Sequence, residues 1–207
     1  MSKSEGSMSL VKRIAAANTW IQTIGITGAL RRLGPLGRRI AWNREFRNGA
    51  RFVGERSSRL QALIAEHAAE RRVVELACGD GSLARVLANM NPTSYRGFDV
   101  SSTAIQEARA RAAPGQEFRV QQMQDWKPTE PFDLLLVEEA IYYISQEQQA
   151  DLIAKAFRAA PQCVIVIAVH SSVKHKASID NCKQCGQVIS DVIDGERHYI
   201  ALRHRAA

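Results

Sequence analysis

A chain of 207 residues, 45% of them apolar, is long enough to build one α/β domain with a sizeable core of its own. Its four cysteines are too few and too unevenly spaced for a disulfide framework, which excludes the small secreted scaffolds and indicates a reducing compartment, the cytoplasm. The net charge of +7 is uneven, because residues 1–72 hold 14 Lys and Arg against 5 Asp and Glu, or +9, while the remaining 135 residues hold 14 against 16, or −2.

The N-terminal part is expected to form two helical regions joined by a basic loop. Apolar residues recur at helical spacing over 10–24, but polar residues interrupt the run, which argues against a signal peptide and against a membrane span. Glycines and Pro35 predict a loop over 27–39, and a second helical region begins at about Ile40. We therefore expect a basic helical extension over residues 1–56 that serves as a lid.

From about residue 57 the chain alternates between helical and extended patterns. Helical segments separate short apolar runs, which predict strands at 72–78, 95–100, 117–123, 132–139 and 163–170. Strands and helices in alternation imply a parallel sheet with helices on both faces and a ligand at the carboxyl ends of the strands. Two alternating runs around Asp194-Gly195 then predict a hairpin, and an antiparallel hairpin does not suit a dinucleotide dehydrogenase.

A glycine-rich loop follows the first predicted strand. The spacing Gly79-x-Gly81-x-x-Ala84, with Asp99 about twenty residues later, fits the dinucleotide-binding fingerprint. Asp80 argues against a pyrophosphate unless its side chain turns away, since two like charges about 4 Å apart cost about 4 kcal/mol at an effective dielectric of about 20. A cationic ligand meets no such repulsion, and Glu75 adds a second acid that could hold the loop or an ammonium group.

The segment VVELACGDGSLARVL, residues 73–87, resembles the first motif of the Rossmann-like, class I S-adenosylmethionine-dependent methyltransferases. Three further motifs follow in the family's order, at Asp99, at Asp125-Trp126 and over residues 132–144. The resemblance covers about residues 57–205. It implies an α/β, doubly wound and mostly parallel seven-stranded sheet, closed by an antiparallel C-terminal hairpin, in a methyltransferase domain over 57–207. The few residues between the fifth strand and the hairpin leave room for a short helix at most.

The same resemblance implies S-adenosylmethionine as the cofactor and assigns roles around it. Asp99 would bind both ribose hydroxyls, with Val100 against the adenine. Asp125 and the backbone of Trp126 would recognise the adenine amino group. Glu138 would lie next to the amino group of the methionine part. The expected cofactor-binding residues are Glu75, Ala77, Cys78, Gly79, Gly81, Asp99, Val100, Asp125, Trp126 and Glu138.

The fourth motif, EEAIYYI, is similar to that of small-molecule methyltransferases of the nodulation N-methyltransferase type. It implies that Glu139, Tyr142 and Tyr143 face the acceptor, although packing or capping roles stay open for them. His170, at the end of the fifth strand, is the candidate general base, because a neutral imidazole accepts a proton near neutral pH. A packing role for His170 is the alternative.

The histidines and cysteines after the fifth strand raise the question of a metal. His170, His175, Cys182 and Cys185 follow the pattern His-x4-His-x6-Cys-x2-Cys, of which the Cys-x-x-Cys pair is half of a zinc site. The spacing from His to Cys fits no known zinc finger. We therefore favour an ordinary loop with free thiols, and no metal, over a zinc site or a redox pair.

These observations predict an enzyme that transfers a methyl group to an oxygen or nitrogen of a small molecule, anionic and saccharide-like acceptors included. One alternative is an RNA methyltransferase, or another nucleic-acid-binding protein, that uses the basic N-terminal third. Only Trp42, Phe46 and Phe52 lie among those arginines, which gives base stacking little support. A nicotinamide-dependent oxidoreductase is the other alternative. No membrane partner is expected, and the oligomeric state is open.

Overall fold

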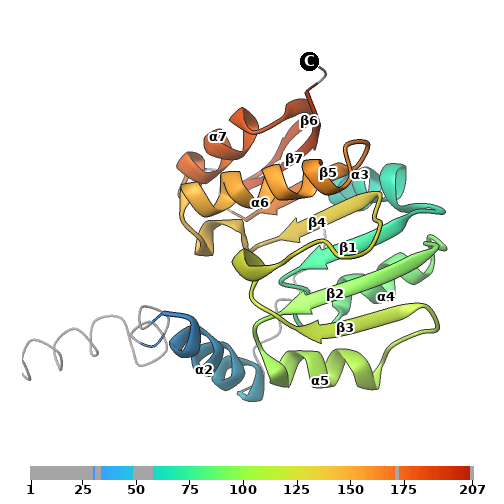
Figure 1. Ribbon diagram of the computed structural model, residues 1–207, viewed down its shortest axis with the longest axis vertical. Coiled ribbons are helices and arrows are strands. Elements are labelled where there is room, and N and C mark those ends of the chain that lie inside the picture. The colour runs from blue at the N-terminus through green and yellow to red at the C-terminus, as the bar shows by residue number, and fades with distance from the viewer. Residues whose placement is uncertain (1–29, 31–33, 49–57, 171–172, 206–207) are drawn as a thin grey trace, which may run out of the picture. The chain divides into compact units, whose positions relative to one another are not determined.

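The computed structural model describes residue 30 and residues 34–48, 58–170 and 173–205, and the chain divides into two units, Met1–Ala50 and Arg51–Ala207 (Figure 1). In the first unit the described part is helix α2 (Gly34–Arg47). The prediction of a loop over residues 27–39 is wrong for its second half, because α2 already begins at Gly34. Pro35 lies in the first turn, where its missing N–H would have no helical partner in any case. The helix expected over 10–24 lies outside the described residues.

The second unit alternates helices and strands as the sequence predicts. Its elements, in chain order, are α3 (Ser58–Ala68), β1 (Arg72–Leu76), α4 (Ser82–Ala88), β2 (Ser94–Asp99), α5 (Ser102–Ala110), β3 (Gln116–Val120), η1 (Met123–Asp125), β4 (Leu134–Glu138), η2 (Ile141–Tyr143), α6 (Gln146–Ala159), β5 (Val164–Val169), α7 (Lys176–Gln184), β6 (Gln187–Asp194) and β7 (Arg197–Arg203). Serine caps begin two of the helices. Ser101 accepts the N–H of Ala104, and Ser145 forms a reciprocal capping box with Gln148.

The strands form one seven-stranded sheet in the order β3-β2-β1-β4-β5-β7-β6. The first five strands are parallel, and β7 runs antiparallel to both β5 and β6. This confirms the predicted fold class, including the antiparallel hairpin. From β1 the chain builds outward to β2 and β3, and it then returns to place β4 on the other side of β1. In sheets of this kind a ligand binds at the carboxyl ends of the strands where the order reverses, here β1 and β4.

Two layers of helices cover the sheet (Figure 1). On one face α6 and α7 pack on alternate residues of the central strands, and on the other face α3, α4 and α5 pack on the residues between them. Every residue of β5 is buried, as expected for a strand covered on both faces. Helix α7 spans nine residues, in line with the short helix expected before the hairpin. These layers hold the strand ends, and hence the candidate site, in fixed positions.

An ion pair with two parallel hydrogen bonds joins the start of β1 to the residue before β4. The guanidinium of Arg72 donates Nε–H to Oδ2 of Asp133 at 2.9 Å and Nη2–H to Oδ1 at 2.7 Å. The backbone N–H of Arg72 also donates to Oδ2, at 2.9 Å. These bonds, the side-chain bond from Arg72 foremost, lower the pKa of Asp133 to about 2.

Asp133→Asn should therefore lower the free energy of unfolding at neutral pH by about 1 kcal/mol, a modest loss because solvent reaches both partners. The pKa of Asp133 is lower in the folded state than the unfolded value of about 3.9, so the stabilisation is fully present above about pH 4 and is lost as the pH falls through about 2. Urea denaturation of the wild type and of Asp133→Asn at a series of pH values checks this. Glu117→Gln, in the exposed pair with Arg119, is the control and should change stability by less than about 0.5 kcal/mol.

Candidate active site

The loop between β1 and α4 turns sharply at the carboxyl end of β1. Ala77, Gly79 and Gly81 all have positive φ, at 62°, 55° and 74°. Glycine adopts this conformation without steric cost, which explains the two glycines of the motif. At Gly81, the residue before α4, a Cβ atom would also lie 3.1 Å from the ring of Phe118. The two glycines therefore let the backbone fold tightly at the point where the strand order reverses.

Asp99, the last residue of β2, holds this loop. One carboxylate oxygen, Oδ2, accepts the N–H of Gly79 at 3.0 Å, and the other, Oδ1, accepts the N–H of Ser101 at 2.7 Å. The side chain is buried, and burial raises the pKa of Asp99 to about 6 although both hydrogen bonds oppose the rise. Each oxygen keeps a further lone pair that could accept a hydroxyl.

The two other acids of the first motif have partners within the protein. Glu75 is buried in β1 and accepts the hydroxyl of Tyr95. Asp80 is also buried, and its Oδ2 forms an ion pair with Arg111 at 3.2 Å and with Arg85 at 3.8 Å. Because these arginines offset its charge, Asp80 does not decide between a pyrophosphate and a cationic ligand. The argument made from its charge alone therefore fails.

The remaining residues expected around a cofactor follow β2, β3 and β4 in turn. Val100 is half-buried and comes directly after Asp99. Asp125 is exposed in η1, whereas the side chain of Trp126 is buried against Phe132, with the ring centroids 5.6 Å apart. Only the backbone of Trp126 can therefore face a ligand. Glu138, the last residue of β4, is half-buried at the strand end beside β1.

Four polar side chains meet where β4 and β5 end, and we call Glu139, Tyr142, His170 and His175 the Glu139 cluster. Oε2 of Glu139 accepts the backbone N–H of His170 at 2.8 Å, lies 2.7 Å from His170 Nδ1, and accepts the Tyr142 hydroxyl at 3.2 Å. The Tyr142 ring stacks on His175, with centroids 3.7 Å apart and planes at 8°. Tyr143 is exposed, and its ring lies 4.7 Å from that of Tyr142. The structure thus brings together all four residues expected on the acceptor side.

The sequence alone does not indicate the roles of two residues in this region. In the sequence His175 stands out only as a possible zinc ligand, yet it is a buried part of the Glu139 cluster, and burial is the main cause that lowers its pKa. Gln149 is fully buried in α6, and its Nε2 donates to the carbonyls of Ile141 and Ile144, at 3.1 and 3.2 Å, and to Ser178 Oγ at 3.0 Å. It therefore ties η2 to α7. The sequence feature that could have indicated this role is a glutamine on the apolar face of a predicted helix.

The zinc hypothesis gains no support from the part of the chain that the structure describes. Within it, no group of three or more His, Cys, Asp or Glu side chains could hold a metal ion. Burial raises the pKa of Cys182 to about 12 and also raises that of Cys185, so both are thiols at neutral pH, which argues against a reactive redox pair. In the same residues, no helix is long and apolar enough to cross a membrane.

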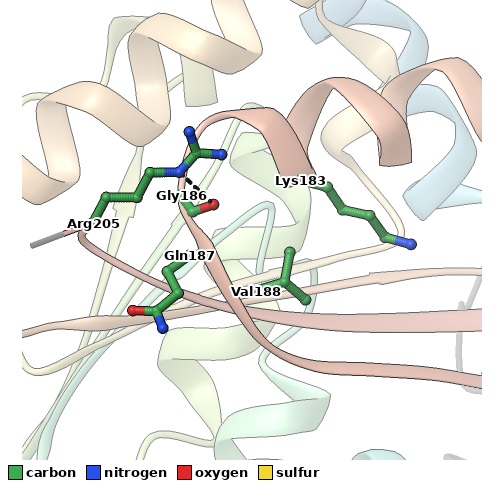
Figure 2. Close-up of a pocket in the computed structure, with 5 residues that line it drawn as sticks. All are labelled: Lys183, Gly186, Gln187, Val188 and Arg205. Atoms are coloured by element: carbon green, nitrogen blue, oxygen red, sulfur yellow. Dashed lines mark hydrogen bonds between the residues drawn. The ribbon is translucent and has the colours of Figure 1, made fainter.

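A shallow hollow lies at the other edge of the sheet, between α7 and the end of β7 (Figure 2). Figure 2 shows Lys183 and Arg205 on either side of it, with Arg205 Nε donating to the Gly186 carbonyl at 3.2 Å. Because β7 is antiparallel to β5, with Leu202 opposite Ile165, this hollow lies near the amino ends of the parallel strands. It is not part of the candidate active site.

Comparison with known proteins supports the interpretation of the sequence motifs as those of a methyltransferase. Residues 73–161 match the family model of a methyltransferase domain. The trans-aconitate 2-methyltransferase of Acidovorax ebreus is 32% identical over 121 residues, which cover 56% of this chain and 46% of that protein. The enzyme of the same name from Rhizobium etli is 30% identical over 98 residues, which cover 46% and 38%. The chain therefore spans less than half the length of these curated relatives.

Solved structures share the fold. N-methyltransferase NodS from Bradyrhizobium japonicum, in complex with S-adenosyl-L-homocysteine, has a TM-score of 0.67 at 15% identity, over 81% of this chain and 98% of that one. A TehB-like S-adenosylmethionine-dependent methyltransferase from Corynebacterium glutamicum has a TM-score of 0.60 at 16% identity, over 79% and 94%. The domain that carries the glycine loop, Asp99 and Glu139 thus has the fold of the Rossmann-like, class I S-adenosylmethionine-dependent methyltransferases, and its residues 73–161 match a methyltransferase domain.

Proposed function

We propose that the protein transfers a methyl group from S-adenosylmethionine to an oxygen or nitrogen of a small-molecule acceptor. The observation that carries the proposal is Asp99, a buried carboxylate that clamps the glycine loop at the point where the strand order reverses. The family match and the antiparallel hairpin favour this reading over a nicotinamide-dependent oxidoreductase. The small-molecule acceptor is supported by the names of the relatives, which include methyltransferases of trans-aconitate.

The residues present fit the proposed cofactor. Both oxygens of Asp99 have room for one more donor, as two ribose hydroxyls would require. Val100 offers an apolar surface to the adenine, and the carboxylate of Asp125 is exposed and could accept a hydrogen bond from the adenine amino group. Glu138 would take the ammonium group of the methionine part. When bound, S-adenosylmethionine supplies an electrophilic methyl group on a positively charged sulfur.

His170 is the proposed general base, with Glu139, Tyr142 and Tyr143 on the acceptor side. Its side chain is 51% exposed at the end of β5, so an acceptor can reach it. A hydroxyl or ammonium acceptor must lose a proton during the transfer, and a positioned imidazole removes it efficiently near neutral pH. The chain's other task is to align the acceptor with the methyl group.

The names of the curated relatives specify a small-molecule acceptor, which favours a small molecule over RNA. The four cysteines are all free, and we propose the cytoplasm as the location on that ground.

Titration calorimetry of the full chain with S-adenosylhomocysteine, the product, tests the cofactor directly. We expect micromolar binding of S-adenosylhomocysteine and none of NADH. Binding of NADH alone would instead identify the glycine loop as a phosphate cradle and would overturn the proposal. The same calorimetry requires no knowledge of the acceptor.

A further inference from the structure

The position of one proton in the Glu139 cluster follows from distances alone. Nδ1 of His170 lies 2.7 Å from Oε2 of Glu139. A nitrogen without hydrogen would set its lone pair against a carboxylate oxygen at this distance, so Nδ1 carries the hydrogen and donates it. The other ring nitrogen, Nε2, then carries a lone pair in the neutral ring, and it makes no hydrogen bond with any described residue.

Tyr142 supports the same assignment. Its hydroxyl lies 3.2 Å from both Glu139 Oε2 and His170 Nδ1, and a protonated Nδ1 cannot accept. Burial raises the pKa of Tyr142, so the hydroxyl keeps its proton at neutral pH and donates it to Glu139. The backbone N–H of His170 donates to the same oxygen. Three donors therefore converge on Oε2 of Glu139 and orient it.

The backbone of Glu139 indicates that its side chain is needed there. Its φ is 55°, a left-handed conformation that costs a residue with a Cβ atom free energy and that glycine adopts readily. Its N–H still donates to the carbonyl of Ala168, at 2.9 Å, which anchors it between β4 and β5. A glutamate in a position suited to glycine points to a role for the carboxylate.

We propose that Glu139 is a positioning residue that fixes His170 with its hydrogen on Nδ1, and that the methyl acceptor is therefore a hydroxyl or amine that carries a proton, not a carboxylate. This inference rests on the proposed methyl transfer. In the reaction the acceptor's lone pair forms the bond to the methyl carbon, and the carbon–sulfur electron pair stays on sulfur, which becomes neutral. The acceptor's proton passes to Nε2 of His170, and the Glu139 carboxylate stabilises the imidazolium that results.

A carboxylate acceptor would use this cluster poorly. It is already ionised at neutral pH and needs no base, and its charge would be repelled by Glu139. Lys176, the first residue of α7, is already paired with Asp180, so its charge is largely taken up. Trans-aconitate, which the relatives carry in their name, is a carboxylate acceptor. The Glu139 cluster therefore predicts an acceptor class for this chain that differs from the one in the relatives' name.

The first test reads the tautomer without any acceptor. Nitrogen chemical shifts of ¹⁵N-histidine-labelled full-length protein, bound to S-adenosylhomocysteine, distinguish hydrogen on Nδ1 from hydrogen on Nε2. We expect Nδ1–H for His170 in the wild type and a shift toward Nε2–H in Glu139→Gln, whose amide can donate. Glu139→Gly, which suits the backbone, should fold and show the same loss of Nδ1–H. Glu147→Gln, an exposed glutamate in the first turn of α6, is the control and should leave His170 unchanged.

The second test addresses the acceptor class. S-adenosylmethionine with a labelled methyl group is offered with a polyol, a phenol, an aliphatic amine or trans-aconitate, and methyl esters are identified by their cleavage in mild base. We expect transfer to a hydroxyl or amine, with a turnover about 100-fold lower in Glu139→Gln and an unchanged KM. Nε2–H in the wild type, an unaltered tautomer in Glu139→Gln, or an ester on trans-aconitate would each overturn the inference. Failure of S-adenosylhomocysteine to bind would instead contradict the proposed function itself.

Discussion

Asp99→Ala should weaken the binding of S-adenosylhomocysteine about 30-fold or more, the equivalent of about 2 kcal/mol, because the ribose hydroxyls lose a charged acceptor. The same change leaves the N–H groups of Gly79 and Ser101 without their partner, so we also expect the free energy of unfolding to fall by about 2 kcal/mol. Calorimetry and urea denaturation measure the two effects separately.

Asp133→Asn is the matched control for this experiment, since it also removes a carboxylate that bonds to a backbone N–H. Asp133 lies just before β4, at the amino ends of the parallel strands, whereas Asp99 lies at the carboxyl end of β2. Asp133→Asn should lower stability and leave the affinity for S-adenosylhomocysteine unchanged. If Asp99→Ala loses stability but keeps its affinity, Asp99 only clamps the loop and does not bind the ribose.

The pH dependence of binding gives a second measure of Asp99. Burial raises the pKa of Asp99 to about 6, so the carboxylate is ionised above that pH and becomes protonated below it. If the ionised form binds the ribose, affinity for S-adenosylhomocysteine should fall about tenfold between about pH 8 and about pH 5 in the wild type. Asp99→Ala should show no such decline.

Features that depend on neighbouring residues in the sequence were predicted well. The alternation of apolar runs and helical segments gave the parallel sheet, because each strand buried on both faces must be apolar throughout, as β5 is. The hairpin followed from Asp194-Gly195, and Gly195 indeed has a positive φ of 62°. Ser101 and Ser102 are both residues of a type that caps helices, and Ser101 is the one that caps α5. Each of these choices is made within a few residues of chain.

Features that depend on distant partners were not predictable in this way. Asp80 forms an ion pair with Arg111, which lies 31 residues away in the sequence, and Glu139 contacts His170 at the same separation. No periodic pattern marks such pairs, because the sheet topology and the side-chain rotamers bring them together only in the folded chain. The sequence identified Glu139 and His170 as separate candidates, whereas their shared hydrogen bond is visible only in the structure.

His170→Ala should lower turnover about 10²–10⁴-fold, the usual contribution of a positioned acid–base group, while the affinity for S-adenosylhomocysteine stays unchanged. Little stability should be lost, because half of the side chain is exposed. Steady-state kinetics on a hydroxyl or amine acceptor, with calorimetry on the same preparation, measures both quantities. An equal loss of turnover and of cofactor affinity would indicate a structural histidine.

Combining this change with Glu139→Gln tests whether the two residues act as a unit. If Glu139 acts only through His170, the double variant should be no slower than His170→Ala, because a positioning residue has nothing left to position. Multiplied losses in the double variant would mean that Glu139 touches the acceptor independently. The contact of 2.7 Å between Glu139 Oε2 and His170 Nδ1, with Tyr142 on the same oxygen, leads us to expect the first result.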